Sequence, residues 1–304
     1  MTSSTNTSYT LAPQSRAPAE NFPVAGWFLS ARVRPAVRAY YAFARTADDI
    51  ADSNTLTVIQ KLAALDALET SLDETALSQV MRTHNIELNN VTDLLVAFRN
   101  DARGTMIKTC ADLMSYCRYS AAPVGRFLLA LHREAQGQTE SDALCAALQI
   151  LNHVQDCRAD AENLKRCYIP LEWLNTAGID LIDVFDPANL ANYGPGYTPI
   201  RDDYAHGEDA PPSTSAKPLD QEKLSGCLNL MLNETETLLR KAQGLPHLLC
   251  DRGLAAQSAT ILHLAQRLLT LLRHSDPWNY RVSLRMIDWI GAAWVGLRMW
   301  IAHR

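Results

Sequence analysis

The chain has 304 residues, of which 47% are hydrophobic, and its formal net charge is −5. This hydrophobic share is enough for a large buried core and excludes a disordered chain. Nucleic acid is excluded as a partner, because no long run of Lys and Arg is present to bind phosphates.

Residues 1–19 are polar and lack the apolar segment of a secretory signal, so we expect a mobile arm. We interpret residues 20–304 as one domain. No uninterrupted stretch of about 18 apolar residues occurs, so we expect no membrane-spanning helix. The seven cysteines are never spaced as CxxC and are typical of reduced core residues in a cytoplasmic protein.

Apolar residues recur at spacings of three and four along most of the chain, which is typical of amphipathic helices. Alternating strand-like runs are almost absent, so the sequence predicts an all-α fold. The expected helices are Arg34–Asp52, Thr55–Ser71, Asn90–Arg99, Leu113–Ala135, Ser141–Leu164, Asp220–Ala242 and Ala255–Leu272.

Residues 186–218 break this pattern, because they are rich in Pro, Gly, Asn, Asp and Ser and have little periodicity. The segments on either side are similar in character, which argues against two independent cores. We therefore interpret 186–218 as a long loop of a single domain, either a flap or a mobile excursion.

The first predicted helix carries a narrow polar stripe on an otherwise apolar surface. Four side chains at positions i, i+4, i+7 and i+11 share one face: Tyr41, Arg45, Asp48 and Asp52. A solvated helix normally has a broad polar side. The narrow stripe is therefore expected to face an internal cavity.

A second stripe occurs about a hundred residues later, within the sequence LQILNHVQDCRAD. It consists of Gln149, Asn152, Asp156 and Asp160, at positions i, i+3, i+7 and i+11. One pair of aspartates spaced in this way is more often a solvated face. Two such pairs on apolar helices favour a shared function. His153 lies off this face, and we interpret it as a packing residue.

Aspartates one helical turn apart cannot both stay ionised in a dry cavity unless a cation neutralises them. Mg²⁺ typically takes one or two carboxylates together with phosphate oxygens. The pairs Asp48/Asp52 and Asp156/Asp160 therefore predict a magnesium clamp around a diphosphate. In such a clamp the metal stabilises the charge of the departing pyrophosphate.

Five stretches of the chain resemble the squalene/phytoene synthase family, the head-to-head prenyl synthases. They are ENFPVA (20–25), YAFARTADDIAD (41–52), AFRNDARG (97–104), YCRYSAAPVGR (116–126) and NHVQDCRADAENLKRCYIP (152–170). The resemblance implies a single-domain isoprenoid-synthase-type helical bundle around a deep central cavity.

The resemblance also implies roles for individual residues. The metal ligands would be Asp48, Asp52, Asp156 and Asp160, with Mg²⁺ as the cofactor. The substrate-binding residues would be Tyr41, Arg45, Gln149, Asn152, Arg166 and Tyr168. Tyr116 would lie near the reacting carbons as a catalytic residue, with a core tyrosine as the alternative. Arg126 is open between a site residue and a structural ion pair.

Within the family, the first, fourth and fifth stretches most resemble bacterial hydroxysqualene synthases of hopanoid pathways. This implies a lyase that converts presqualene diphosphate and water to hydroxysqualene and pyrophosphate. The alternatives are a synthase that condenses two prenyl diphosphates such as farnesyl diphosphate, or a family member without catalysis that serves in assembly. Two features depart from the family: Lys165 replaces the usual glycine, and the 186–218 loop is unusually long.

A hydrocarbon cavity should accompany the diphosphate site, because a carbocation must be shielded from bulk water. The candidate wall residues are Phe22, Tyr41, Phe43, Tyr116, Leu128 and Leu129. The C-terminal stretch 286–304 combines Trp, Ile and Leu with Arg. It is either an amphipathic helix in peripheral contact with the inner face of the membrane or a final core helix.

Overall fold

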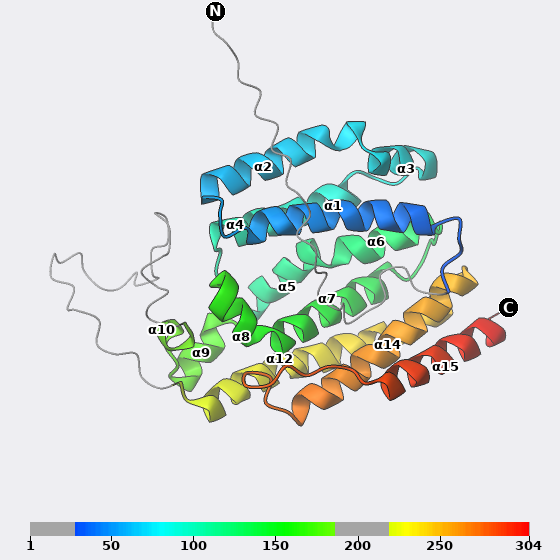
Figure 1. The fold of residues 1–304 in the computed structure, drawn as a ribbon. Coiled ribbons are helices and arrows are strands. Elements are labelled where there is room, and N and C mark those ends of the chain that lie inside the picture. The colour runs from blue at the N-terminus through cyan, green and yellow to red at the C-terminus, as the bar shows by residue number, and fades with distance from the viewer. Residues whose placement is uncertain (1–27, 186–218, 304) are drawn as a thin grey trace, which may run out of the picture.

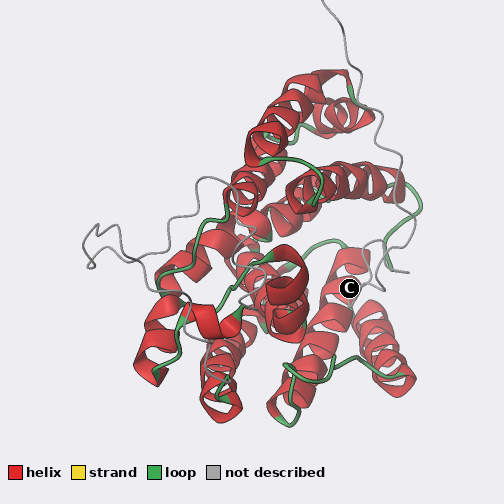
Figure 2. Cartoon of the chain, turned by 60° about the vertical axis from the view of Figure 1, so that its left-hand side comes forward, coloured by secondary structure: helices red, strands yellow, loops and turns green. Residues whose placement is uncertain are grey.

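The computed structural model describes residues 28–185 and 219–303. The arm 1–19, Phe22 and the loop 186–218 lie outside the described residues. Within those residues every regular element is a helix, which confirms the all-α prediction (Figure 2). The helices are α1 (Arg34–Asp52), α2 (Val58–Thr70), α3 (Ala76–His84), α4 (Asn89–Arg103), α5 (Cys110–Ser120), α6 (Ala122–Leu131), α7 (Gln138–Gln155), α8 (Cys157–Ala159), α9 (Leu171–Ala177), α10 (Leu181–Val184), α12 (Gln221–Ala242), α13 (Leu245–Leu248), α14 (Arg252–Arg273) and α15 (Met286–Ala302).

Helix α7 lies at the centre of the molecule and packs against α5, α6, α12 and α14 (Figure 1). On one side, α4 packs against α1, α2, α5 and α6. On the other side, α14 packs against α12 and α15. Among the described helices, none is long and apolar enough to cross a membrane.

Several helices begin at a residue whose side chain accepts a hydrogen bond from the first turn. Thr57 and Gln60 form a capping box at α2, and Thr109 and Asp112 form another at α5. Such caps satisfy amide groups that have no partner inside the helix. The local sequence therefore fixes where these helices begin.

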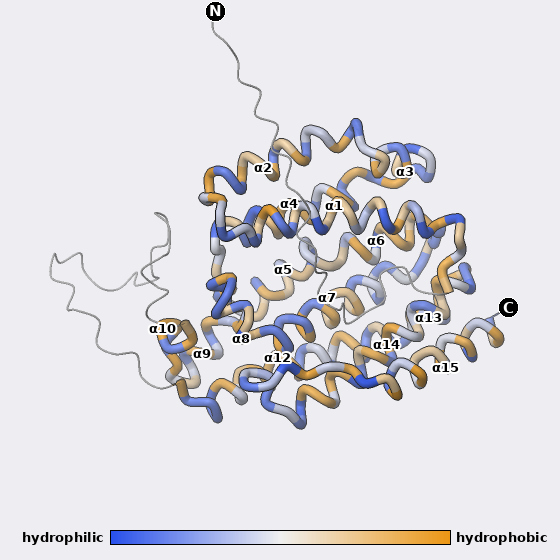
Figure 3. Tube along the Cα trace, viewed as in Figure 1, coloured by the Kyte–Doolittle hydropathy of each residue, from blue (hydrophilic) through white to orange (hydrophobic). Residues whose placement is uncertain are grey.

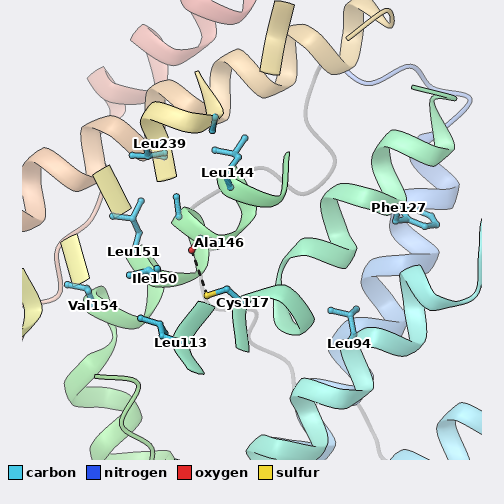
Figure 4. Close-up of a cluster of buried hydrophobic side chains, with 14 of the residues drawn as sticks. Leu94, Leu113, Cys117, Phe127, Leu144, Ala146, Ile150, Leu151, Val154 and Leu239 are labelled. Carbon is cyan, nitrogen blue, oxygen red and sulfur yellow. Dashed lines mark hydrogen bonds between the residues drawn. The ribbon is translucent and has the colours of Figure 1, made fainter. Parts of the chain in front are cut away.

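The core consists of aliphatic side chains packed between the helices. Figure 3 shows hydrophobic (orange) and hydrophilic (blue) stretches alternating along most helices. Around α7 the core includes Leu113, Cys117, Ile150 and Leu151, all almost completely buried (Figure 4). The cysteines form no disulfide. Cys117 and Cys227 are buried, as expected of core residues, whereas Cys250 is exposed.

The prediction of one helix over Leu113–Ala135 is wrong. The chain forms α5 and α6, with a break at Ala121. Pro123 is in the first turn of α6, where its missing N–H group costs nothing, but in the middle of a helix it would remove a hydrogen bond. The break therefore falls just before the proline.

The single helix predicted over Ser141–Leu164 is also wrong. Helix α7 ends at Gln155, and Asp156 has φ −105° and ψ 12°. After the short α8, residues Asp160–Leu164 form a π-helical turn, and Lys165 takes a left-handed conformation with φ 55°. Turns of this kind interrupt helices most often at functional sites.

Candidate active site

A pocket of about 550 Å³ lies between α1, α4, α5, α6 and α7, and residues around Arg166 and Arg281 complete its wall. Its size is in the usual range for small-molecule sites. Helices α1 and α7 run in the same direction across it (Figure 1). Along each helix the pocket residues change from mainly apolar ones nearer its start, such as Val37 on α1 and Cys145 on α7, to polar ones nearer its end, such as Asp52 and Asn152. The pocket thus has an apolar end and a polar end.

The structure brings all the site residues predicted from the sequence to this one pocket. They are Tyr41, Arg45, Asp48, Asp52, Tyr116, Gln149, Asn152, Asp156, Asp160, Arg166 and Tyr168. Their positions are therefore compatible with a common site. Their roles as metal ligands, substrate contacts and catalytic group stay predictions.

The two α1 aspartates each pair with an arginine. Arg45 Nη1 lies 3.0 Å from Asp48 Oδ2, and Arg166 Nη1 lies 2.6 Å from Asp52 Oδ1. Burial, and next the neighbouring Asp52 carboxylate, raise the pKa of Asp48 to about 7. Two carboxylates this close in a desolvated site favour the binding of a cation or a proton.

Each aspartate of the second pair also has a charged or polar partner, one distant in the sequence and the other seven residues away. Arg281 Nε donates to Asp156 Oδ1 at 2.8 Å. His153 Nδ1 lies 3.9 Å from Asp160 Oδ2. Burial raises the pKa of Asp160, and His153 opposes this shift.

His153 is buried and packs against its neighbours, as the sequence predicts, but the prediction that it lies off the polar face is wrong. Its ring lines the pocket and stacks on Tyr168, with ring centroids 3.6 Å apart. Its Nε2 lies 3.1 Å from Gln149 Nε2. The reason is that the pocket contacts a wider part of the α7 surface than the single row of residues predicted from the sequence. His153, which follows Asn152, therefore also faces the pocket.

Asp101 on α4 joins the two tyrosines of the site. The hydroxyl of Tyr116 donates to Asp101 Oδ2 at 2.9 Å, and that of Tyr168 donates to Oδ1 at 3.3 Å. Burial raises the pKa of Asp101, while Arg166 lowers it. Burial also raises the pKa of both tyrosines, so both hydroxyls remain protonated at neutral pH.

The apolar wall is only partly as predicted. Tyr41, Tyr116 and Leu128 line the pocket. Phe43 and Leu129 do not line it and are instead buried in the core, so their assignment to the wall is wrong. In each case the side chain points about 100° around the helix from a neighbour that does line the pocket.

Arg126 pairs with Asp142 through two hydrogen bonds of 2.9 and 2.6 Å, which is the structural ion pair given above as the alternative to a site residue.

The model of the squalene/phytoene synthase family matches residues 15–195. A hydroxysqualene synthase of Zymomonas mobilis is 33% identical over 287 residues, which cover 91% of this chain and 86% of that protein. The chain belongs to the squalene/phytoene synthase family. A hydroxysqualene synthase of Rhodopseudomonas palustris is likewise 33% identical, over 94% of this chain and 90% of that protein.

Solved structures of the squalene/phytoene synthase family share the fold. A squalene synthase from Alicyclobacillus acidocaldarius superposes with a TM-score of 0.65 at 28% identity, over 83% of this chain and 87% of that one. A dehydrosqualene synthase solved with a ligand gives a TM-score of 0.67 at 20% identity, over 89% of this chain and 88% of that one. This second likeness concerns the fold alone.

The charges around this family member's pocket are unbalanced. Its wall holds three guanidinium groups and a larger number of carboxylates, namely those of Asp48, Asp52, Asp101, Asp156 and Asp160. A bound diphosphate would add further negative charge, which is costly in a desolvated site. Within residues 28–185 and 219–303, no three His, Cys, Asp or Glu side chains converge as a ready-made metal site. The donor set fits Mg²⁺, which takes one or two carboxylates and completes its shell with phosphate oxygens and water.

Proposed function

We propose that this chain converts presqualene diphosphate and water to hydroxysqualene and pyrophosphate. The observation that carries the proposal is the two-ended pocket, with two aspartate pairs at one end and apolar walls at the other. The choice of product is supported by the hydroxysqualene synthases that are 33% identical over about nine tenths of the chain.

In this proposal Mg²⁺ is held by Asp48 and Asp52 on one side and by Asp156 and Asp160 on the other. The metal supplies Lewis-acid stabilisation of the charge on the departing pyrophosphate. The guanidinium groups of the polar end donate charge-assisted hydrogen bonds to the phosphate oxygens. At the apolar end, Tyr41 and Leu128 exclude bulk water from the carbocation.

The test supplies presqualene diphosphate and farnesyl diphosphate separately to the purified protein, with Mg²⁺ and without NADPH. We expect the first substrate to yield an alcohol and pyrophosphate, and the second to remain unchanged. Condensation of farnesyl diphosphate would instead identify a synthase that joins two prenyl diphosphates. No turnover of either substrate would favour a non-catalytic role.

We further propose that α15 lies on the inner surface of the membrane and keeps this cytoplasmic protein close to its hydrocarbon substrate. One face of α15 packs on α14 and buries Asp288, Ala292 and Gly296. The opposite face exposes a continuous apolar stripe, spaced three and four residues apart, consisting of Ile287, Ile290, Trp294, Leu297 and Ile301. Their exposed fractions range from 40% at Leu297 to 73% at Ile287.

This stripe has the character of an interfacial helix, with apolar and Trp side chains on one face. Arg285 and Arg298 are exposed beside it and favour anionic lipid headgroups. We expect Trp294→Glu to abolish sedimentation with vesicles of anionic phospholipid. Ile59→Glu on α2 is the control, because Ile59 is 80% exposed and far from the stripe in the sequence. Unchanged vesicle binding by Trp294→Glu, or dimerisation through α15, would overturn this proposal.

A further inference from the structure

Ser120 is the last residue of α5 and one of the residues that line the pocket, and its Oγ is almost completely buried. In the described part of the chain, Ser120 Oγ is the single buried side-chain nitrogen or oxygen without a hydrogen-bond partner. Leaving such a group unpaired is costly, because its hydrogen bonds to water are lost and not replaced. A buried polar group in this state commonly marks the place of a bound water.

Other buried hydroxyl groups on the helices form a hydrogen bond to a backbone carbonyl of their own helix. Thr235 and Thr260 each donate to the carbonyl oxygen four residues earlier, at 2.9 Å. This arrangement is the usual one for a hydroxyl inside a helix. Ser120 departs from it, so the one donor and two acceptor positions of its hydroxyl have no partner among the described residues.

The surroundings of Ser120 in the chain are apolar. The pocket residues that follow it are Ala121, at the break before α6, and then Val124, Phe127 and Leu128 on α6. Tyr116 lies one turn earlier on α5, and its hydroxyl is already bonded to Asp101. Ser120 therefore offers an unbonded polar atom on a stretch of wall that otherwise suits a hydrocarbon.

We propose that Ser120 Oγ holds the one water molecule that adds to the carbocation, an inference that rests on the proposed function. When the C–O bond of presqualene diphosphate breaks, its electron pair leaves with pyrophosphate. Ser120 Oγ accepts a hydrogen bond from the water, which leaves a lone pair of the water oxygen free to face the cationic carbon.

That lone pair forms the new C–O bond of the alcohol, and no oxidation or reduction takes place. The proton released from the added water passes to pyrophosphate, the base that the reaction itself liberates. A pocket with apolar walls and one water-binding hydroxyl limits the addition to a single water. Ser120 thus acts on the choice of product, after the diphosphate has left.

The experiment compares wild type, Ser120→Ala and Ser120→Thr with presqualene diphosphate and Mg²⁺ in H₂¹⁸O. Pyrophosphate release and the fraction of product that carries ¹⁸O are measured separately. We expect Ser120→Ala to release pyrophosphate within about threefold of wild type, while the alcohol fraction falls about tenfold in favour of hydrocarbon. Ser120→Thr should retain the alcohol, because it keeps the hydroxyl.

The matched control is Ser258→Ala, which removes a buried hydroxyl from α14 that does not line the pocket. It should leave the product unchanged. An unchanged alcohol fraction in Ser120→Ala would overturn the proposal, as would a parallel fall in pyrophosphate release. As a second measurement, a crystal structure of the wild type should show an ordered water bonded to Ser120 Oγ, and a dry hydroxyl would count against it. If the wild type itself forms no alcohol, the proposed function fails instead.

Discussion

Asp48 and Asp49 are adjacent on α1, and Arg45 contacts both, but only Asp48 lines the pocket. Under the proposed function, Asp48→Asn removes a metal ligand whose loss costs several kcal/mol of transition-state stabilisation. We expect the turnover of presqualene diphosphate to fall by about 10³-fold, because each 1.36 kcal/mol corresponds to a factor of ten.

Asp49→Asn removes the same charge one position away and should retain activity within a few fold. Both variants should keep the helical circular dichroism of the wild type. Equal losses of turnover in the two variants would mean that charge alone, and not the pocket position, matters.

Lys165, which ends the π-helical turn, has a strained backbone. Its backbone has φ 55° and ψ 42°, a left-handed conformation that costs a non-glycine residue about 1–2 kcal/mol. We therefore expect Lys165→Gly to be more stable than Lys165→Val by about that amount in urea unfolding. The same two substitutions at Lys241, within α12, should give the opposite order, because glycine is the poorer helix former there.

At this scale the sequence predicts the stripe residues well, because helical periodicity alone places them on common faces. It does not predict the bond between Arg281 and Asp156 or the one between Asp101 and Tyr116. These partners are brought together by the packing of separate helices, which no local pattern records. The unpaired hydroxyl of Ser120 is likewise visible only once its surroundings are known.

Asp288 fixes the start of α15 and joins this helix to α14. Its Oδ2 accepts from the Arg285 amide and its Oδ1 from Arg267 Nε, both at 2.9 Å. The backbone hydrogen bond, with help from Arg267, holds the pKa of Asp288 below its usual value. We expect Asp288→Asn to lower the free energy of unfolding by about 1–2 kcal/mol at pH 7, since the lost bonds involve a charged acceptor.

The sign of the pH dependence follows from the lowered pKa. The stabilisation is present above the unfolded pKa of about 3.9 and is lost as the pH falls through the folded value. The gap between wild type and Asp288→Asn should therefore close below about pH 4. Glu74→Gln, at an exposed position, is the control. A gap that stays constant with pH would show that the charge of Asp288 plays no part.

For whole helices, the sequence predicts where a helix occurs but not where it is interrupted. Most of the expected helices are present with boundaries near those predicted. The exceptions are the breaks at Ala121 and Asp156. The first follows from a proline, whereas the second, at Asp156, has no comparable sequence signal, and neither has the π-helical turn that follows at Asp160–Leu164.

The fold of the whole molecule brings the two aspartate pairs together, since α1 carries one pair, the segment that follows α7 carries the other, and all four aspartates line one pocket. Mg²⁺ and pyrophosphate together should therefore stabilise the fold more than either alone. At ligand concentrations about 100-fold above the dissociation constant, the gain is about 2.7 kcal/mol, which for a chain of 304 residues corresponds to a rise in Tm of about 4 °C.

Differential scanning calorimetry checks this expectation. Pyrophosphate without metal should give little shift, because the carboxylates of the pocket repel it. Asp48→Asn should lose most of the joint shift. An equal shift with pyrophosphate alone would contradict a metal-mediated clamp.

The parallel course of α1 and α7 has one more consequence. Along α1 the pocket wall runs from Asp48 back to Val37, a distance of roughly 16 Å at about 1.5 Å per residue. The helix that carries the aspartates at the diphosphate end thus also determines how much space the pocket leaves for the hydrocarbon part of the substrate. Under the proposed function, the length of α1 that lines the pocket limits the length of the hydrocarbon chain that fits. Ala44 lies between the two ends of this wall, so a larger side chain at that position would shorten the accepted chain.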